Sequence, residues 1–299
     1  MKIRKGLGLL SVLPALMLAS LAPAKPPAAV HVAQPGLWKL ADADTTIYLF
    51  GTIHALPKDY VWESPELKAV IAHADELVIE TVIDRDPQKV ATLLFGMGKA
   101  AAPSPILDRV PPAKRTALQG VIARSGLPIA VLDQLKTWAA GVMLTAVTLK
   151  DLGLDPESGV EEQLKAQFAA QTKPIAGLEK PEQQLGYLDS LPEADQRAFL
   201  GTVADDPAQG RKDFAAMLAS WSHGDEKRMA RAFDKDLEAT PKLRVVLLDQ
   251  RNANWTNWLA DRLKKPGTIL VAVGAGHLAG PNSVQAKLAA RGLKAVRVE

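Results

Sequence analysis

Short apolar runs alternate with amphipathic segments along the chain from about residue 38 onwards. Runs rich in β-branched and aromatic residues predict buried strands, and segments with apolar positions three or four residues apart predict helices. The strands expected on this basis are Trp38–Leu40, Thr45–Phe50, Leu77–Ile79, 173–179, Thr268–Val273 and 294–298. Because helical segments separate most of the strands, the pattern predicts an α/β fold. We expect a central, largely parallel or mixed β-sheet with flanking helices.

Helical segments of very different length join these strands. Ser64-Pro65-Glu66 has the residue types of a helix start, and residues 85–170 are mainly helical with several prolines. Residues 181–265 again show a helical pattern, which we interpret as a helical cap or insertion before a final strand–helix–strand unit. We expect residues 36–299 to form a single domain.

The first 24 residues have the pattern of a signal peptide. Three basic residues open the chain, an apolar stretch follows, and Ala22-Pro23-Ala24 is a small-x-small cleavage site. Cleavage would leave a mature chain beginning near Lys25, with a Pro/Ala-rich leader over residues 25–35. The sequence therefore predicts an exported protein, periplasmic or secreted.

Composition narrows the possible functions. The chain has no cysteine, which excludes disulfide scaffolds, thiolate metal sites and cysteine nucleophiles. The formal charge of +3 comes from the basic residues before position 6, so the mature chain would be neutral and gives no support for nucleic-acid binding. No later apolar run is long enough for a membrane helix, so we expect no stable membrane insertion after cleavage.

Four of the predicted strands end at a polar residue that could take part in catalysis or ligand binding: His54, Glu80, Glu179 and His277. The carboxyl ends of parallel strands meet at one edge of a sheet, so these side chains are expected to share a crevice. Burying two imidazoles and two carboxylates together is costly unless a ligand or proton chemistry requires it. Any one of them alone would more simply be a cap or half of an ion pair.

Both histidines close a Gly-x-x-His tetrapeptide. Gly51 and Gly274 begin the two motifs and Gly276 directly precedes His277; glycines here allow a sharp turn or a close ligand approach. His54, His277 and Glu80 would suit a divalent ion such as Mn, Co or Zn. The same residues could instead act without a metal, as a general base and its orienting acid. Spacing does not choose between these options.

One arginine is a natural companion to this acidic cluster. In the helix expected around residues 243–262, Arg251 falls on or beside an apolar stripe formed by Leu243, Leu247, Trp258 and Leu259. An arginine there needs an acid, or it faces a substrate carboxylate, phosphate or oxyanion.

The glycines from Gly274 to Gly280 also permit a rival interpretation. They follow a strand and open a helix, as in a dinucleotide-binding unit, but their spacing is G-x-G-x-x-x-G. H-E-x-x-H, G-x-S-x-G and P-loop motifs are absent from the sequence.

Several motifs, in order, resemble those of the TraB/GumN family. They are Leu49–His54, Glu76–Glu80, Gly159-Val160-Glu161, Gly177–Leu185, Arg251-Asn252 and Val273–Gly280. The resemblance runs from about Trp38 to Val298. It implies a superfamily that includes the Tiki metalloproteases, erythromycin esterase-like enzymes and haem-binding ChaN-like proteins. By position it implies site roles for His54, Glu80 and His277 first, then Glu179 and Arg251. One departure is Thr81, where many relatives have an acid.

These observations lead to a metal-dependent, peptidase-like hydrolase as the main hypothesis. The His/Glu cluster would hold the ion, Glu80 or Glu179 would take a proton from bound water, and Arg251 would stabilise the oxyanion. The alternatives are a non-enzymatic haem- or metal-binding protein and a metal-free esterase with His54 as its base. The substrate, a peptide or a small molecule, is not readable from the sequence. We also expect Glu179 and Arg251 to border the same pocket as the histidines.

Overall fold

The computed structural model describes residues 33–84, 86–237 and 241–299. The predicted signal peptide and residues 25–32 of the predicted leader lie outside this range. At the end of that leader, Ala33 is buried and its N–H donates to Val61 O (3.3 Å), while the N–H of Gln34 donates to Ser222 O (2.8 Å). Val32–Glu299 form one compact unit.

A mixed sheet lies at the centre of this unit. Its six strands in the described residues follow the order β4-β3-β5-β2-β1-β6. β2, β5, β3 and β4 are parallel, whereas β1 is antiparallel to both β2 and β6. The bounds are β1 Leu37–Ala41, β2 Thr45–Thr52, β3 Glu76–Thr81, β4 Ile175–Glu179, β5 Gly267–Gly274 and β6 Val296–Arg297. The predicted α/β fold is confirmed.

The register brings the carboxyl ends of the parallel strands to one edge. Thr52 of β2 pairs with Gly274 of β5, and Thr81 of β3 pairs with Glu179 of β4. The residues that follow these positions therefore leave the sheet side by side. This edge is where a parallel sheet offers a binding crevice.

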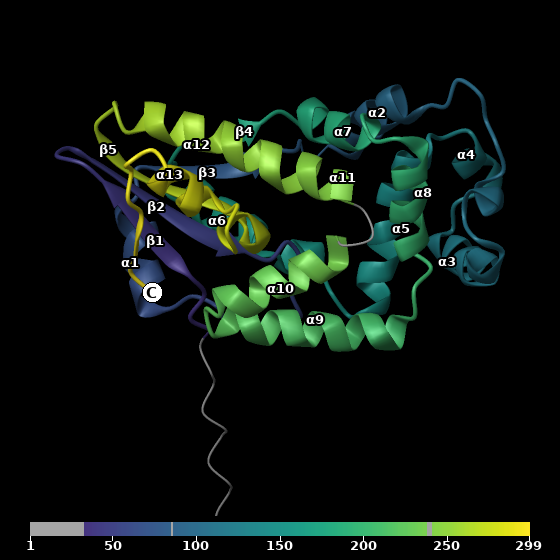
Figure 1. Ribbon diagram of the computed structural model, residues 1–299, viewed down its shortest axis with the longest axis horizontal. Coiled ribbons are helices and arrows are strands. Elements are labelled where there is room, and N and C mark those ends of the chain that lie inside the picture. Colours follow the sequence, from purple (N-terminus) through teal and green to yellow (C-terminus); the bar gives the residue numbers. More distant parts are fainter. Residues whose placement is uncertain (1–32, 85, 238–240) are drawn as a thin grey trace, which may run out of the picture. The chain divides into compact units, whose positions relative to one another are not determined.

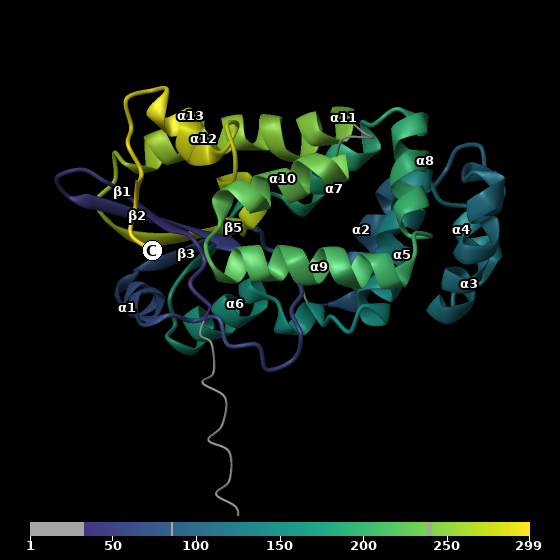
Figure 2. The same ribbon diagram turned by 60° about the horizontal axis from the view of Figure 1, so that its bottom comes forward.

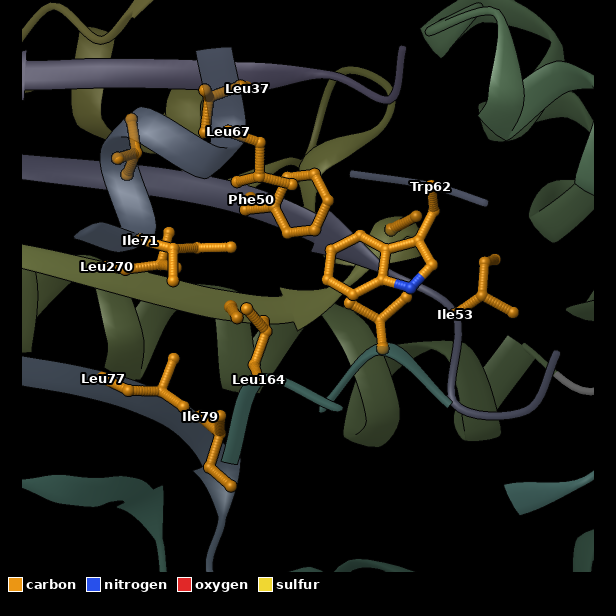
Figure 3. Packing of buried hydrophobic residues seen from close by; sticks show 14 of the residues in the cluster. Leu37, Phe50, Ile53, Trp62, Leu67, Ile71, Leu77, Ile79, Leu164 and Leu270 are labelled. Atoms are coloured by element: carbon orange, nitrogen blue, oxygen red, sulfur yellow. The ribbon is translucent and has the colours of Figure 1, made fainter. Parts of the chain in front are cut away.

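Helices cover both faces of the sheet. α1 (Pro65–His73) and α6 (Val160–Ala170) pack on the face that presents Leu77, Ile79 and Leu270, and Figure 3 shows part of this cluster. α12 (Gln250–Arg262) and α13 (Val284–Ala289) pack on the opposite face, against Val78 and Val271. Figure 2 shows the two pairs below and above the strands. Because side chains alternate along a strand, Glu80 faces the α12 side together with Val78.

A separate apolar cluster holds the helices that lie to the right of the sheet in Figure 1. Trp138, Leu144 and Leu200 are among its fully buried members. The helices between β3 and β4, besides α6, are α2 Pro87–Gly98, α3 Arg115–Ser125, α4 Ile129–Asp133 and α5 Thr137–Asp151. After β4 come α7 Pro181–Asp189, α8 Glu193–Thr202, α9 Pro207–Ser222, α10 Glu226–Leu237 and α11 Pro241–Arg244.

The helix expected around residues 243–262 is interrupted by one π-helical turn, Val245–Asp249, between α11 and α12. Trp255 is fully buried beside Arg251, whereas Trp258, which the regular helical spacing placed on the apolar stripe, is only half-buried. Trp255 is four residues before the buried Leu259, so both lie on the same face of α12.

Among the described residues, none of the helices combines the length and apolar character needed to span a membrane.

Candidate functional site

Glu80 lies at the centre of the polar cluster at the sheet edge. Its Oε1 accepts a hydrogen bond from the backbone N–H of Gly274 (2.8 Å). The same oxygen lies 3.7 Å from His277 Nε2 and 3.9 Å from His54 Nε2. The structure thus brings together three residues that are far apart in sequence.

The charge of Glu80 is held by its neighbours. Burial favours the neutral acid, but the positive charge of the Arg251 guanidinium opposes that effect, and the pKa of the Glu80 carboxyl lies well below its usual range. Glu80 is therefore an ionised hydrogen-bond acceptor at neutral pH. It is not poised to take a proton.

Arg251 connects Glu80 to the second predicted acid, Glu179. Its Nη2 donates to Glu80 Oε2 (2.5 Å) and to Glu179 Oε2 (2.9 Å), and its Nε donates to Glu179 (3.0 Å). Trp255 Nε1 donates to the other oxygen of Glu179 (3.0 Å), and its ring lies 4.7 Å from the guanidinium carbon. Burial alone would lower the pKa of Arg251, but Glu80 and Glu179 raise it.

The five N–H groups of Arg251 are all engaged by protein acceptors. Besides the carboxylates, Nη1 donates to Leu247 O (3.3 Å) and to His277 Nε2 (3.2 Å). Leu247 belongs to the π-helical turn, so this irregular turn offers a carbonyl to the guanidinium. In this arrangement Arg251 has no donor left for an oxyanion, and the role it supports is that of a clamp.

His277 is buried and held at both ring nitrogens. Its Nδ1 lies 2.6 Å from Asn252 Oδ1, and its Nε2 accepts from Arg251. The ring also packs against Trp255, with centroids 4.3 Å apart. Burial lowers the pKa of His277 to about 3, so the imidazole is neutral at physiological pH.

His54 has the opposite environment. Its side chain is 67% exposed, and its Nδ1 lies 2.6 Å from Glu161 Oε1. The hydroxyl of Thr52 also donates to that oxygen. The carboxylate of Glu161 raises the pKa of His54 well above the usual value of an imidazole, against the effect of desolvation.

A cleft of about 330 Å³ opens beside His54 and Glu80. One part of its wall is apolar and another is acidic; its lining residues are His54, Ile79, Glu80, Thr81, Ile83, Pro156, Glu157, Glu161, Glu162, Lys165 and Gln184. The expectation that Glu179 and Arg251 would border this pocket is wrong, since both lie behind Glu80. Gln184 connects the two parts by donating to Glu80 Oε2 (3.3 Å) and Glu179 Oε2 (3.2 Å).

Thr81, the residue that departs from the family pattern, also lines the cleft. Its Oγ1 is buried and has no hydrogen-bond partner among the described residues. An acid at this position would add a carboxylate to the cleft wall. This chain has a neutral hydroxyl there instead.

The predicted glycines make close approaches possible. A Cβ on Gly274 would lie 3.1 Å from Glu80 Oε1 and 3.3 Å from His54 Nε2, and one on Gly276 would lie 3.0 Å from the ring of Phe233. Gly51 lies against Ala275, and its carbonyl accepts from Trp221 Nε1 (2.8 Å). Gly274 is therefore the glycine that touches the reactive groups themselves.

Sequence reasoning assigned no role to several members of the site, among them Glu161, Asn252, Trp255, Gln184 and Lys165. Glu161 and Asn252 belong to motifs quoted above, yet no role was assigned to either. The available signal for Glu161 was Gly159, which opens α6: a Cβ there would collide with the carbonyl oxygen of His54. Asn252 directly follows Arg251, and its bond with His277 is a tertiary contact that the sequence pattern does not predict.

The geometry does not fit a metal ion at the predicted position. The lone pair of His277 Nε2 is used by Arg251, whose positive charge already lies between Glu80 and His277. Among the described residues, no three His, Asp or Glu side chains are grouped as ligands of one ion. The divalent metal and the haem alternative stay predictions, and no chemical step is assigned to either.

The chain is similar to proteins of two enteric bacteria, each named "Uncharacterized protein YbaP". The Escherichia coli K12 protein is 24% identical over 254 residues, which cover 85% of this chain and 92% of the relative. The Shigella flexneri protein is 25% identical over 237 residues, covering 79% and 85%. No solved structure matches the chain. The TraB/PrgY/gumN family model matches residues 36–297, which include every strand and the whole site described above. This chain belongs to the TraB/PrgY/gumN family.

Proposed function

We propose that this protein is a hydrolase of ester or amide bonds in which His54 acts as the general base without a metal ion. The observation that carries the proposal is the His54–Glu161 pair at the mouth of the cleft. General-base catalysis needs an accessible imidazole with one nitrogen on a carboxylate, and His54 lines the cleft with Nδ1 2.6 Å from Glu161 and Nε2 3.9 Å from Glu80.

The reaction uses the two nitrogens of His54 differently. In the neutral form of the imidazole, Nδ1–H donates to Glu161, which leaves Nε2 as the proton acceptor. Nε2 takes a proton from a water molecule while the water oxygen attacks the substrate carbonyl carbon. When the tetrahedral intermediate collapses, the bond to the leaving group breaks and Nε2–H returns the proton to the leaving oxygen or nitrogen. Protons balance over the cycle, and no other reactant is required.

Glu80 contributes through its fixed negative charge. Its Oε1 is 3.9 Å from His54 Nε2, too far for a hydrogen bond but close enough to stabilise the imidazolium that forms. Arg251 and the Gly274 N–H hold both Glu80 oxygens in place. Glu80 is thus proposed as an electrostatic stabiliser.

Lys165 is the candidate for oxyanion stabilisation. It is the one lysine or arginine among the described residues that line the cleft, and it is paired with Glu162 on the same helix. We therefore assign oxyanion stabilisation, the role that the sequence predicted for Arg251, to Lys165, which lines the cleft.

The test is hydrolysis of p-nitrophenyl acetate and of a quenched fluorescent casein, before and after exhaustive dialysis against a chelator. The expected result is hydrolysis of at least one probe that survives chelation and disappears in the His54→Ala variant. Hydrolysis that chelation abolishes and Mn²⁺, Co²⁺ or Zn²⁺ restores would instead support the metal-dependent hypothesis. Hydrolysis of neither probe would contradict the proposal.

We also propose that the protein works outside the cytoplasm, on the evidence of residues 1–24 alone. The intact mass of the natural protein should correspond to a chain that begins near Lys25. A retained Met1 would contradict export by cleavage.

A further inference from the structure

We propose that Asn252 is a positioning residue, which fixes the tautomer of His277 and through it the orientation of Arg251 and Glu80. This inference deepens the proposed function, and its spectroscopic test stands without any activity. It follows from the order of donors and acceptors in one buried chain of hydrogen bonds. Asn252 has 2% relative exposure and His277 has 4%, so bulk water does not take the place of any link.

The orientation of the Asn252 amide is the first link. Its Nδ2 donates to the backbone carbonyl of Asn282 (2.8 Å), which can only accept. The oxygen Oδ1 must then be the atom that faces His277 Nδ1 at 2.6 Å. A flipped amide would place two acceptors against each other at Asn282 and two donors against each other at His277.

The tautomer of His277 is the second link. Because Asn252 Oδ1 accepts, Nδ1 carries the hydrogen, and in a neutral imidazole Nε2 is then an acceptor. Nε2 faces Arg251 Nη1 at 3.2 Å, and a guanidinium offers only donors. The other tautomer would bring two N–H groups together in a buried place.

The orientation of Glu80 is the third link. Arg251 Nη2 donates to Glu80 Oε2, which turns Oε1 toward Gly274 N–H and the two histidine rings. The position of the Glu80 carboxylate, whose charge faces His54, thus depends on the side-chain amide of Asn252, which contacts the other nitrogen of the His277 ring. The competing explanation is that Asn252 only ties α12 to the loop at Asn282, as a structural contact.

Imidazole nitrogen chemical shifts separate these explanations. We would label the five histidines with ¹⁵N, record long-range ¹H–¹⁵N spectra at pH 7, and assign His277 by the signals lost in His277→Gln. The wild type is expected to show a protonated Nδ1 and an unprotonated Nε2. Asn252→Leu removes the acceptor and should abolish this fixed tautomer, whereas Asn252→Asp keeps an acceptor and should keep Nδ1 protonated.

Thr256→Val is the matched control. Thr256 is fully buried one turn further along α12, and its hydroxyl donates to the backbone carbonyl of Asn252 (2.6 Å) rather than to the side chain. Its loss should lower the melting temperature in the same way as Asn252→Leu without changing the His277 spectrum. If Asn252→Leu does not fold, the wild-type and Asn252→Asp spectra decide.

The positioning role also predicts an effect on rate. In Asn252→Leu, kcat for whichever probe the wild type hydrolyses should fall by about 10- to 100-fold with little change in KM, and Thr256→Val should keep the wild-type kcat. A wild-type His277 protonated at Nε2, or an Asn252→Leu spectrum identical to wild type, would overturn the inference. Absence of hydrolysis in the wild type would contradict only the proposed function.

Discussion

His54 and His277 follow neighbouring parallel strands, and each closes a Gly-x-x-His tetrapeptide, yet their surroundings are opposite. The His54 side chain is 67% exposed and rests on a carboxylate that raises its pKa. The His277 side chain is 5% exposed, packed on Trp255, and neutral. The motif places each histidine just after its strand, but the helix that packs beside each ring determines its hydrogen bonds and its pKa. α6 supplies Glu161 to one ring, and α12 supplies Arg251 and Asn252 to the other.

The largest effect is expected from removing the exposed ring, that of His54. His54→Ala should reduce hydrolysis by about 10²- to 10⁴-fold, the usual contribution of a general base, and leave the fold intact because the ring is exposed. His73→Ala on α1 is the matched control, since that histidine is exposed and, within the described part of the chain, its ring bonds to Ala69 O of its own helix. Equal activity of the two variants in an initial-rate assay would contradict the assignment of His54.

Glu179, which pairs with buried Arg251, and Glu161, which pairs with exposed His54, should contribute differently to the free energy of unfolding. Glu179→Gln places an amide against buried Arg251 and should lower the free energy of unfolding by about 3–5 kcal/mol. Glu161→Gln should lower it by less than about 1 kcal/mol, because its partner His54 is exposed to water. Urea denaturation of both variants measures this difference. Similar losses would mean that the surroundings of Arg251 are no more protected from water than those of His54.

The pH dependence of the rate tests the pair of His54 and Glu161 alone. A base must be neutral to accept a proton, and Glu161 raises the pKa of His54, so kcat/KM should increase with pH and level off well above pH 6.5. Glu161→Gln should move the midpoint of this increase to lower pH by about one to two units. A rate that falls as pH increases through this range would show that His54 acts as an acid in the limiting step.

The smallest expected effect is on stability as a function of pH, with opposite signs for the two rings. The pKa of His277 is about 3 when folded, below its unfolded value, so acid favours the unfolded chain and stability falls as pH drops below about 6.5. The slope from this group is at most about 1.4 kcal/mol per pH unit. The pKa of His54 is raised on folding, so its contribution is present below about pH 6.5 and is lost as pH increases through the raised value.

Urea denaturation at pH 5, 7 and 9 checks both signs. The advantage of wild type over His277→Gln should grow from pH 5 to pH 7, and its advantage over His54→Gln should shrink from pH 7 to pH 9. The same sign for both variants would mean that the two environments are less different than the structure indicates.

The sheet and the meeting of its strand ends were predictable from local pattern, because strands such as Thr268–Val273 are uniform apolar runs that end on a glycine or a polar residue. The hydrogen-bond partners of Arg251 and His277 were not predictable. The π-helical turn whose Leu247 carbonyl accepts from Arg251 is not visible in the periodicity, and Trp255 rather than Trp258 is the tryptophan buried beside Arg251. Glu161 was missed for a related reason: its position depends on how closely Gly159 lets α6 approach His54, which is a tertiary contact.

The place of β5 in the sheet has a consequence for when the site comes into existence. β2 and β3 both pair with β5, and in the strand order β5 separates them. A nascent chain that has emerged only as far as residue 266 therefore lacks the strand that brings His54 and Glu80 into register, along with the Gly274 N–H that orients Glu80. The site forms only after β2 and β5, whose paired residues are 222 apart in sequence, have come together, and non-local pairings of this kind favour slow folding. Partly synthesised chains and fragments that end before β5 should consequently lack the assembled site, so the proposed activity should depend on completion of the fold.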